Sequence, residues 1–222
     1  MDAENAPDWL GKTVVLGFLS LIALIAATAL ALALGAADPR PAGPLVWDTD
    51  FVAGADEAEW VLHSSRAARA EFTPAGLLLA FEAEDETALS LRSAPTGDFT
   101  FAARGAQVDG PPGAMYGIAF GVRSESNYVA VLVNNNGFVQ AYRNSGATRE
   151  VLYALQQWPH ILLKDEPNEV QINLIDGRAM IRINEEVFLE IADAGGEIGL
   201  IATARAPGQM VRFTRARLWA AG

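Results

Sequence analysis

Apolar residues recur at every second position beyond Pro44, and this alternation limits what that part of the chain can fold into. In YGIAFGVRSESNYVAVLV, residues 116–133, two such runs flank a short polar turn. Because successive side chains of a strand point to opposite faces of a sheet, the pattern predicts a hairpin with one buried face. Similar short runs separated by turn residues continue to the C-terminal end. The sequence therefore predicts an antiparallel β-sandwich.

The alternation also places the individual strands. Asp176-Gly177 gives the strongest hairpin signal, because both residue types accept the positive φ angles of a two-residue turn. The region 150–158 is ambiguous, since its apolar residues fit neither period cleanly. We expect strands at residues 45–51, 68–72, 76–82, 88–92, 98–105, 116–123, 127–133, 138–143, 169–175, 178–184, 186–191, 197–204 and 210–219.

The first part of the chain has a different character, because no residue from Thr13 to Ala37 is charged. A helix of this length crosses a hydrocarbon core of about 30 Å. A secretory signal peptide has a shorter apolar core behind a basic start, whereas residues 1–12 are acidic apart from Lys12. We therefore expect an N-terminal tail (1–12), a transmembrane helix (13–37), a proline-rich linker (38–44) and a β-sandwich domain (45–222). Cleavage after Ala37 is the alternative.

Two further expectations concern the helix. The charges that flank it, Lys12 and Arg40, are nearly balanced, so they do not fix its orientation. A short tail inside and a large domain outside is the common single-pass arrangement, and we expect the C-terminal domain outside the cytoplasm of a bacterial cell. Small residues four apart would let a second helix approach closely, unless they merely reflect an alanine-rich segment. They are Ala23, Ala27, Ala31 and Gly35.

Charge and cysteine content exclude several classes of function. The chain has 27 acidic and 16 basic residues, a formal charge of −11, so a phosphate backbone would repel it. We therefore expect no nucleic acid partner. There is no cysteine, which excludes disulfides, thiolate metal sites and a cysteine nucleophile.

The order of several short segments carries a family resemblance. They are Asp50-Phe51, Trp60, GDFTFAAR (97–104), the hairpin at 116–133, EVQINLIDGRAMIRIN (169–184), EIGLIA (197–202) and VRFTRARLW (211–219). Together they resemble the concanavalin A-like lectin/glucanase superfamily, especially bacterial laminin-G-like domains, over residues 45–219. The resemblance implies an all-β fold, an antiparallel jelly-roll sandwich, here behind one transmembrane helix. It also implies carbohydrate binding on a concave face or its rim loops.

The glucanases of this superfamily carry two catalytic glutamates on one strand, spaced E-x-D-x-x-E or E-x-D-x-E. This chain has no such motif: Glu84 stands in an acidic turn and Glu190 at a strand end. His63 and His160 have no metal-binding or catalytic-triad context around them. We therefore expect a protein that is not an enzyme and needs no cofactor.

Calcium is the one metal that the resemblance leaves open, because laminin-G-like domains often hold it through rim carboxylates. The candidates by type are Asp48, Asp50, Asp98 and Asp109. However, relatives often carry acidic residues in the closing strand, where this chain has Phe213-Thr214-Arg215.

Alternation assigns the two faces of the hairpin at 116–133. On the first strand Tyr116, Ile118, Phe120 and Val122 should face the core, and on the second Val129, Val131 and Val133. The other side of the first strand is left poor in side chains. We expect that surface, with a tryptophan beside a loop, to contact a sugar ring or another protein. The predicted ligand-binding residues are Gly117, Ala119, Gly121, Arg123, Tyr128, Asn134 and Trp158. The run Asn134-Asn135-Asn136 before Gly137 is predicted first of all to form a hairpin turn.

Two functions follow from these observations. The first is a membrane-anchored, lectin-like, non-catalytic module that binds glycan or cell-envelope polysaccharide. The second is a single-pass accessory subunit of a larger membrane complex, held in the lipid by one helix, with the sandwich as a docking domain.

Overall fold

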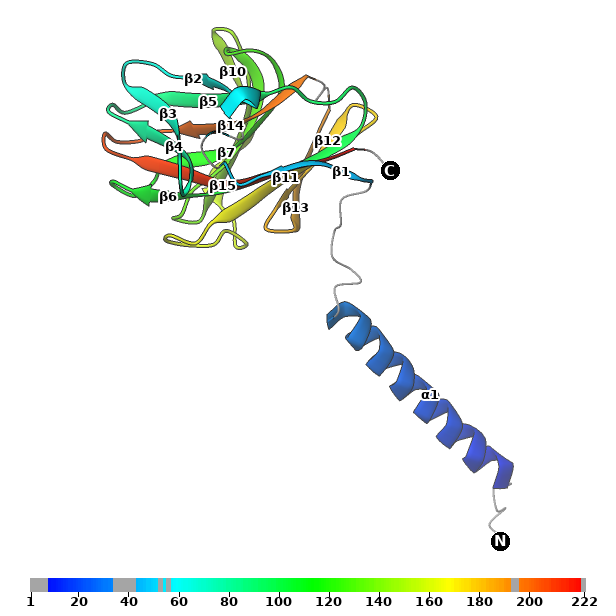
Figure 1. The fold of residues 1–222 in the computed structure, drawn as a ribbon. Coiled ribbons are helices and arrows are strands. Elements are labelled where there is room, and N and C mark those ends of the chain that lie inside the picture. Colours follow the sequence, from blue (N-terminus) through cyan, green and yellow to red (C-terminus); the bar gives the residue numbers. More distant parts are fainter. Residues whose placement is uncertain (1–7, 34–42, 52–53, 55–56, 193–195, 221–222) are drawn as a thin grey trace. The chain divides into compact units, whose positions relative to one another are not determined.

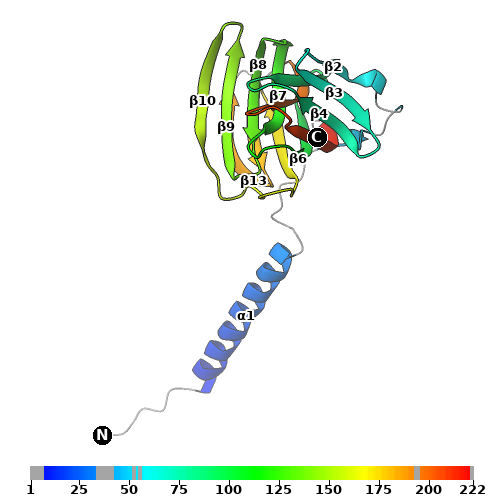
Figure 2. The same cartoon turned by 90° about the vertical axis from the view of Figure 1, so that its left-hand side faces the viewer.

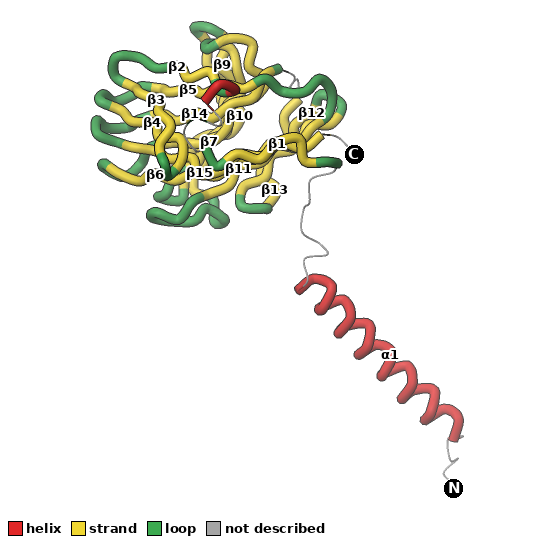
Figure 3. Tube along the Cα trace, viewed as in Figure 1, coloured by secondary structure: helices red, strands yellow, loops and turns green. Residues whose placement is uncertain are grey.

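The computed structural model describes residues 8–33, 43–51, 54, 57–192 and 196–220. The chain divides into two compact units, Met1–Arg40 and Pro41–Gly222. Figure 3 shows one long helix in the first unit and a second unit built almost entirely of strands.

The helix of the first unit, α1, spans Asp8–Ala33 and begins five residues before the predicted start. Its stretch Thr13–Ala31 is long and apolar enough to cross a membrane, and a signal sequence near an N-terminus meets the same criterion. Ala23, Ala27 and Ala31 lie on this helix, whereas Gly35 and the predicted end at Ala37 lie outside the described residues.

The second unit contains two antiparallel sheets, which we call sheet A and sheet B (Figure 1). Sheet A has the order β13 (Glu186–Ala192), β12 (Arg178–Ile183), β11 (Asn168–Ile175), β6 (Phe99–Asp109), β15 (Met210–Ala220), β4 (Gly76–Phe81) and β3 (Ala68–Thr73), and β1 (Leu45–Thr49) also pairs with β15. Sheet B has the order β10 (Thr148–Gln157), β9 (Phe138–Ser145), β8 (Asn127–Val133), β7 (Met115–Ser124), β14 (Glu197–Thr203), β5 (Thr87–Arg92) and β2 (Val61–His63). Figure 2 shows β10, β9, β8 and β7 side by side.

This architecture confirms the predicted all-β jelly-roll sandwich. Every expected strand is present, and the Asp176-Gly177 turn has φ angles of 50° and 73° at its two residues, as a two-residue hairpin requires. Two strands were not predicted. The ambiguous region became β10, and β2 is a three-residue strand at the other edge of sheet B.

The core lies between the sheets and contains the side chains that alternation assigned to it. Tyr116, Ile118 and Phe120 of β7 are at most 1% exposed. On β8, Val129, Val131 and Val133 face the same core, as predicted. Phe101 and Phe213 from sheet A pack opposite them in the same cluster.

A β-bulge at Gly121 reverses the alternation at the end of β7. Gly121 has a φ of 59°, and two β14 positions, Glu197 and Gly199, pair with Val122 and Ala119, three residues apart. The extra residue turns Val122 away from the core into a second apolar cluster on the other face of sheet B. The prediction that Val122 faces the core was therefore wrong.

Candidate functional site

The face of sheet B that we expected to be open is filled by side chains. Gly117, Ala119 and Gly121 are buried, and large residues of neighbouring strands occupy the space above the small ones. Leu132 and Ile201, the register partners of Gly117, are each fully buried. The remaining members of this outer apolar cluster are Leu89, Leu91, Met115, Val122, Tyr128, Ala130 and Tyr142.

The glycines on this face are explained by contacts within the sheet. A Cβ atom on Gly117 would lie 2.1 Å from the carbonyl oxygen of Val131, and Gly121 needs its positive φ for the bulge. The expectation of an exposed platform at Gly117, Ala119 and Gly121 was therefore wrong. A role for these residues in binding stays a prediction.

The other predicted ligand residues lie in three different places. Gly121, Arg123 and Tyr128 line a hollow of about 240 Å³ with Arg143. Burial raises the pKa of the Tyr128 phenol, whose ring packs 6.3 Å from that of Tyr142. Trp158 is half-buried against Phe188, with ring centroids 5.3 Å apart. These residues therefore do not form one site.

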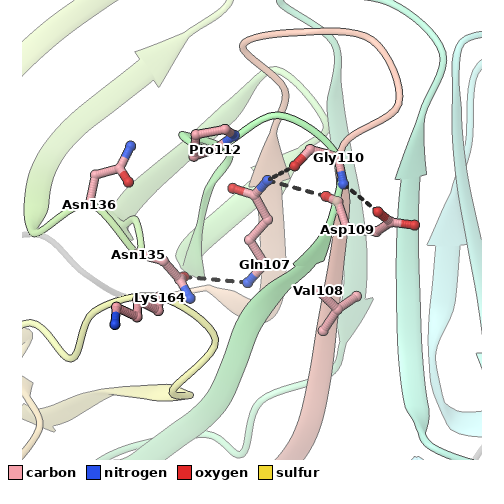
Figure 4. Close-up of a pocket in the computed structure, with 8 residues that line it drawn as sticks. All are labelled: Gln107, Val108, Asp109, Gly110, Pro112, Asn135, Asn136 and Lys164. Carbon is pink, nitrogen blue, oxygen red and sulfur yellow. Dashed lines mark hydrogen bonds between the residues drawn. The ribbon is translucent and has the colours of Figure 1, made fainter.

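Asn134 belongs instead to a turn beside a larger polar hollow, which we call the rim pocket. Its Oδ1 accepts hydrogen bonds from the backbone N–H groups of Asn136 and Phe138, each over 3.0 Å, so its side chain closes the β8–β9 turn. The rim pocket has a volume of about 440 Å³. It is lined by Gln107, Val108, Asp109, Gly110, Pro112, Asn135, Asn136 and Lys164 (Figure 4).

Gln107 holds one wall of the rim pocket in place. Its Oε1 accepts from the backbone N–H groups of Gly113 and Ala114, each over 3.0 Å. Its Nε2 donates to the carbonyl of Pro111 over 2.6 Å, and the carbonyls of Asp109 and Gly110 lie within 3.3 Å. A single buried amide therefore organises the whole β6–β7 loop, which carries Pro112 and Gly110 into the pocket wall.

A second buried amide supports the same loop from the opposite side. Gln209 donates through Nε2 to the carbonyl of Pro111 over 2.7 Å and accepts from the N–H groups of Arg205 and Ala206. A Cβ atom on Gly110 would lie 2.3 Å from the carbonyl oxygen of Gly208, so the two loops are in close backbone contact. This wall is consequently held from both sides by buried amide side chains.

The opposite wall depends on Asn135, which is 8% exposed. Its Oδ1 accepts from the N–H of Gln107 over 3.4 Å and from the phenol of Tyr116 over 2.6 Å. The Gln107 N–H can only donate, so the amide of Asn135 must present its oxygen there. Its Nδ2 is then a buried donor with no acceptor among the described residues, in a side chain that lines the pocket. Such a donor is costly unless a bound group satisfies it.

Tyr116 and Asn168 fix the position of Asn135 from below. Asn168 donates through Nδ2 to the Tyr116 oxygen over 2.9 Å and to the carbonyl of Leu162 over 3.0 Å. Burial raises the pKa of the Tyr116 phenol, so it stays a hydrogen-bond donor. The backbone N–H of Lys164 donates to the Asn135 carbonyl over 3.0 Å, which brings the 158–167 segment to the pocket.

The mouth of the rim pocket combines groups of different kinds. Asp109, Asn136 and Lys164 are exposed there and offer a carboxylate, an amide and an ammonium group. In Figure 4, Asn136 and Lys164 lie on one side of Gln107 and Asp109 on the other. Val108 and Pro112 add apolar surface. Hydroxyl groups both donate and accept, so this lining suits a polyhydroxylated ligand.

The pocket opens at the end of the sandwich opposite the first strand. Leu45 pairs with Trp219, and Trp219 with Thr100 at the start of β6, whereas Asp109 ends β6. A strand of this length spans roughly 33–37 Å. The rim pocket is therefore far from the point where the segment after α1 joins the domain.

The four candidate calcium ligands do not converge. Asp98 and Asp109 flank the two ends of β6, and Asp98 accepts from the N–H of Asp176 over 2.9 Å. Asp48 binds Arg215 through both carboxylate oxygens, at 2.9 and 2.5 Å. Within the described ranges no three Asp, Glu or His side chains are placed to share a metal ion.

The glutamates and histidines considered for catalysis are also dispersed. Glu84 lies in an exposed turn, and Glu190 receives a hydrogen bond from Arg178 over 3.0 Å. His63 lies on β2, its Nδ1 2.7 Å from Glu125 Oε1, and His160 lies in the loop after β10. These residues occupy separate parts of the domain.

Sequence reasoning missed most of the rim pocket. It proposed Asn134 and considered Asp109, but Gln107, Asn135 and Lys164 come from three segments whose approach depends on the folded topology. The run Asn134-Asn135-Asn136 was the available signal, and it predicted the turn correctly.

No family model matches the sequence, and no curated protein matches it. Solved structures show the fold. A carbohydrate-binding module, CBM66 from Bacillus subtilis, is similar with a TM-score of 0.57 and 16% identity, covering 73% of this chain and 96% of that one. The exoplasmic domain of VIP36, solved with Ca²⁺ and mannose, has a TM-score of 0.57 and 11% identity. The match covers 79% of this chain and 91% of that one. An endo-1,3-β-glucanase catalytic domain from Thermotoga petrophila has a TM-score of 0.55 and 10% identity. The match covers 82% of this chain and 99% of that one. The domain therefore shares the galectin-like, concanavalin A-like sandwich, in which both binding domains and hydrolases occur.

Proposed function

We propose that this protein is a membrane-anchored, non-catalytic carbohydrate-binding protein whose sandwich domain lies outside the cytoplasm and holds its ligand in the rim pocket. The similarity to a carbohydrate-binding module and to a domain solved with mannose bound supports carbohydrate as the ligand class. Helix α1 supports the anchor, because Thr13–Ala31 is long and apolar enough to span a bilayer. We retain the laminin-G-like relationship as part of this proposal.

The single observation that carries the choice of site is the Nδ2 donor of Asn135. This nitrogen is buried and has no acceptor within the described part of the chain, and its residue lines the rim pocket. A sugar hydroxyl or ring oxygen would accept from it, while Asn136 and Asp109 would bond the outer hydroxyls. The walls are already held by Gln107 and Gln209, so binding would cost little ordering.

A non-catalytic role agrees with the placement of the carboxylates. Glycoside hydrolysis needs two carboxyl groups on either side of the scissile bond. The rim pocket is lined by one carboxylate, that of Asp109, and its Oδ1 accepts from the N–H of Gly110 over 2.7 Å.

The experiment is a glycan array probed with the full chain in mild detergent, followed by chromatography of each bound glycan. We expect the protein to bind a subset of glycans or cell-envelope polysaccharides, and we expect the bound glycans to keep their length. Cleavage products would contradict the non-catalytic part, and an array without any bound glycan would contradict the ligand class.

A second candidate function is that of an accessory subunit in a larger membrane complex. The observation in its favour is β10, an edge strand of sheet B on which Val151 is 65% and Leu155 49% exposed. Extraction in mild detergent distinguishes the two functions. A stoichiometric protein partner would support the subunit, whereas a chain that migrates alone and binds glycan would support the carbohydrate-binding protein.

A further inference from the structure

The face of sheet A that points away from the core is rich in arginine, although the chain as a whole is strongly acidic. We call it the arginine face. On each strand its residues alternate with buried ones, as Arg104 does between Ala103 and Gly105. Its basic residues are Arg69, Arg104, Arg178, Arg182, Arg212, Arg215 and Arg217, and its acidic ones are Asp48, Glu71, Glu169 and Glu190.

Part of this positive charge is balanced within the sheet. Arg215 pairs with Asp48, and Arg217 donates to Glu169 over 2.8 Å. Arg178 pairs with Glu190 over 3.0 Å. These contacts use up most of the carboxylates on the face.

Arg104 and Arg212 share the remaining carboxylates poorly. Arg104 stands opposite Glu169 across the β6–β11 pair, but that carboxylate binds Arg217 over 2.8 Å. Across the β6–β15 pair Arg104 stands opposite Arg215, and like charges directly opposite each other destabilise a sheet. Arg212 stands opposite Ala106 and Leu78, and its Nε is buried with no hydrogen-bond partner among the described residues. Within those residues neither guanidinium forms an ion pair. The face is therefore suited to an external anion that several guanidiniums can share.

Aliphatic side chains are exposed on the same face. Leu45 is 51%, Ile175 57% and Val187 51% exposed, and each lies in register with an outward residue of a neighbouring strand. Trp219 lies beside Leu45, with the Arg217 guanidinium 5.1 Å from its ring centroid. Guanidiniums next to exposed aliphatic and indole groups are the combination that favours a lipid headgroup region over a fully aqueous polyanion.

The covalent link to α1 limits how far the domain can lie from the membrane in which α1 is inserted. Residues 34–44 join α1 to Leu45, and even fully extended they cover at most about 40 Å. This segment therefore acts as a tether that keeps the concentration of lipid headgroups near the domain high. Because the chain carries −11 overall, an anionic membrane would repel most of it, whereas the excess of arginine on this face favours contact there.

We infer that the arginine face binds the anionic headgroups of the membrane in which α1 is inserted. This inference rests on the proposed membrane anchoring and is independent of the proposed carbohydrate ligand.

The test uses the full chain in nanodiscs, because a sequence without cysteine allows clean single-site labelling. One fluorophore is placed at Ile175→Cys on the arginine face and, separately, at Val151→Cys on β10 of sheet B as the matched exposed control. The nanodiscs contain a lipid quencher in phosphatidylcholine, with or without phosphatidylglycerol.

We expect phosphatidylglycerol to increase quenching at Ile175 at least about twofold, with little change at Val151, and high salt to reverse the effect. Replacing Arg104 and Arg212 by Gln should remove most of the gain. As a control, Arg66→Gln and Arg205→Gln replace exposed arginines outside sheet A. This control pair should leave the gain in quenching unchanged.

Equal quenching at both labels, or no response to phosphatidylglycerol, would overturn the inference. So would an Ile175 signal that responds to soluble dextran sulfate and not to phosphatidylglycerol, since that would assign the face to a polyanionic glycan. A chain that fails to enter nanodiscs would overturn the anchor and this inference together. Glycan binding by the rim pocket can succeed or fail without affecting any of these readouts.

Discussion

The phenol of Tyr116 donates a hydrogen bond to Oδ1 of Asn135 over 2.6 Å, so a residue of the core fixes a residue of the rim pocket. Tyr116 is 1% exposed and packs edge to face with Phe213 of the opposite sheet. The geometry of the candidate site is consequently coupled to the packing of the two sheets.

Tyr116→Phe tests this coupling. The substitution removes the hydroxyl that links Asn135 and Asn168. One N–H of the Asn168 amide loses its acceptor, and the Asn135 oxygen keeps only the longer bond from the Gln107 N–H. We expect a loss of about 1–3 kcal/mol in the free energy of unfolding, together with weaker glycan binding. Chemical denaturation and a binding isotherm measure the two effects. Tyr153→Phe, at a half-buried tyrosine of β10, is the control and should change neither.

Gln107→Leu tests the support of the β6–β7 loop. Leucine has nearly the same size but neither accepts from Gly113 and Ala114 nor donates to Pro111. We expect destabilisation of about 2–4 kcal/mol and a marked loss of binding, because several buried backbone groups lose their partners. Gln140→Leu on β9, whose side chain makes no hydrogen bond within the described residues, should be tolerated. Equal stability of the two variants would contradict the role given to Gln107.

Gly117→Ala tests whether the outer face of sheet B is filled by side chains around Gly117 or open. The added Cβ would lie 2.1 Å from the Val131 carbonyl oxygen, so the sheet would have to shift. We expect a loss of more than about 2 kcal/mol in thermal or chemical unfolding, comparable with a core truncation such as Phe120→Ala. A variant as stable as the wild type would mean that this part of sheet B is open after all.

Asp48→Asn tests the pair that joins β1 to β15. The hydrogen bond from Arg215 is the main cause that lowers the pKa of Asp48. A carboxyl whose pKa is lowered by folding contributes stability above its unfolded pKa of 3.8, and that contribution is lost as the pH falls below it. Because both side chains are partly exposed, we expect only about 0.5 kcal/mol at neutral pH. The variant should also lose stability less steeply than the wild type between about pH 5 and 3. Parallel pH profiles would contradict this reading.

The sequence predicted the sandwich because strand alternation is a local property. It held for Ile118, Phe120 and the valines of β8, and it failed at Val122, where a bulge inserts one residue. The bulge depends on pairing with β14, which no local pattern reveals. Strand β10 was ambiguous for a similar reason, since its pairing with β9 shifts register twice.

The candidate site was harder to predict than the fold. Small residues on β7 indicated an open face, but whether Leu132 and Ile201 fill it depends on which strands flank β7. The rim pocket joins residues 107–112, 135–136 and 164, which become neighbours only through the topology. The asparagine run was correctly interpreted as a turn, but the buried donor of Asn135 could not be inferred from it.

The central claim is that the rim pocket binds carbohydrate. Its most direct test is the affinity of the full chain, in mild detergent, for a glycan selected on the array, compared with that of the double variant Asn136→Ala, Lys164→Ala. Both residues are exposed at the pocket mouth, so the fold should remain intact. We predict at least a roughly tenfold loss of affinity, equivalent to two modest hydrogen bonds, and no loss for the control Asn144→Ala on β9. Unchanged affinity of the double variant, with glycan still bound, would contradict the account.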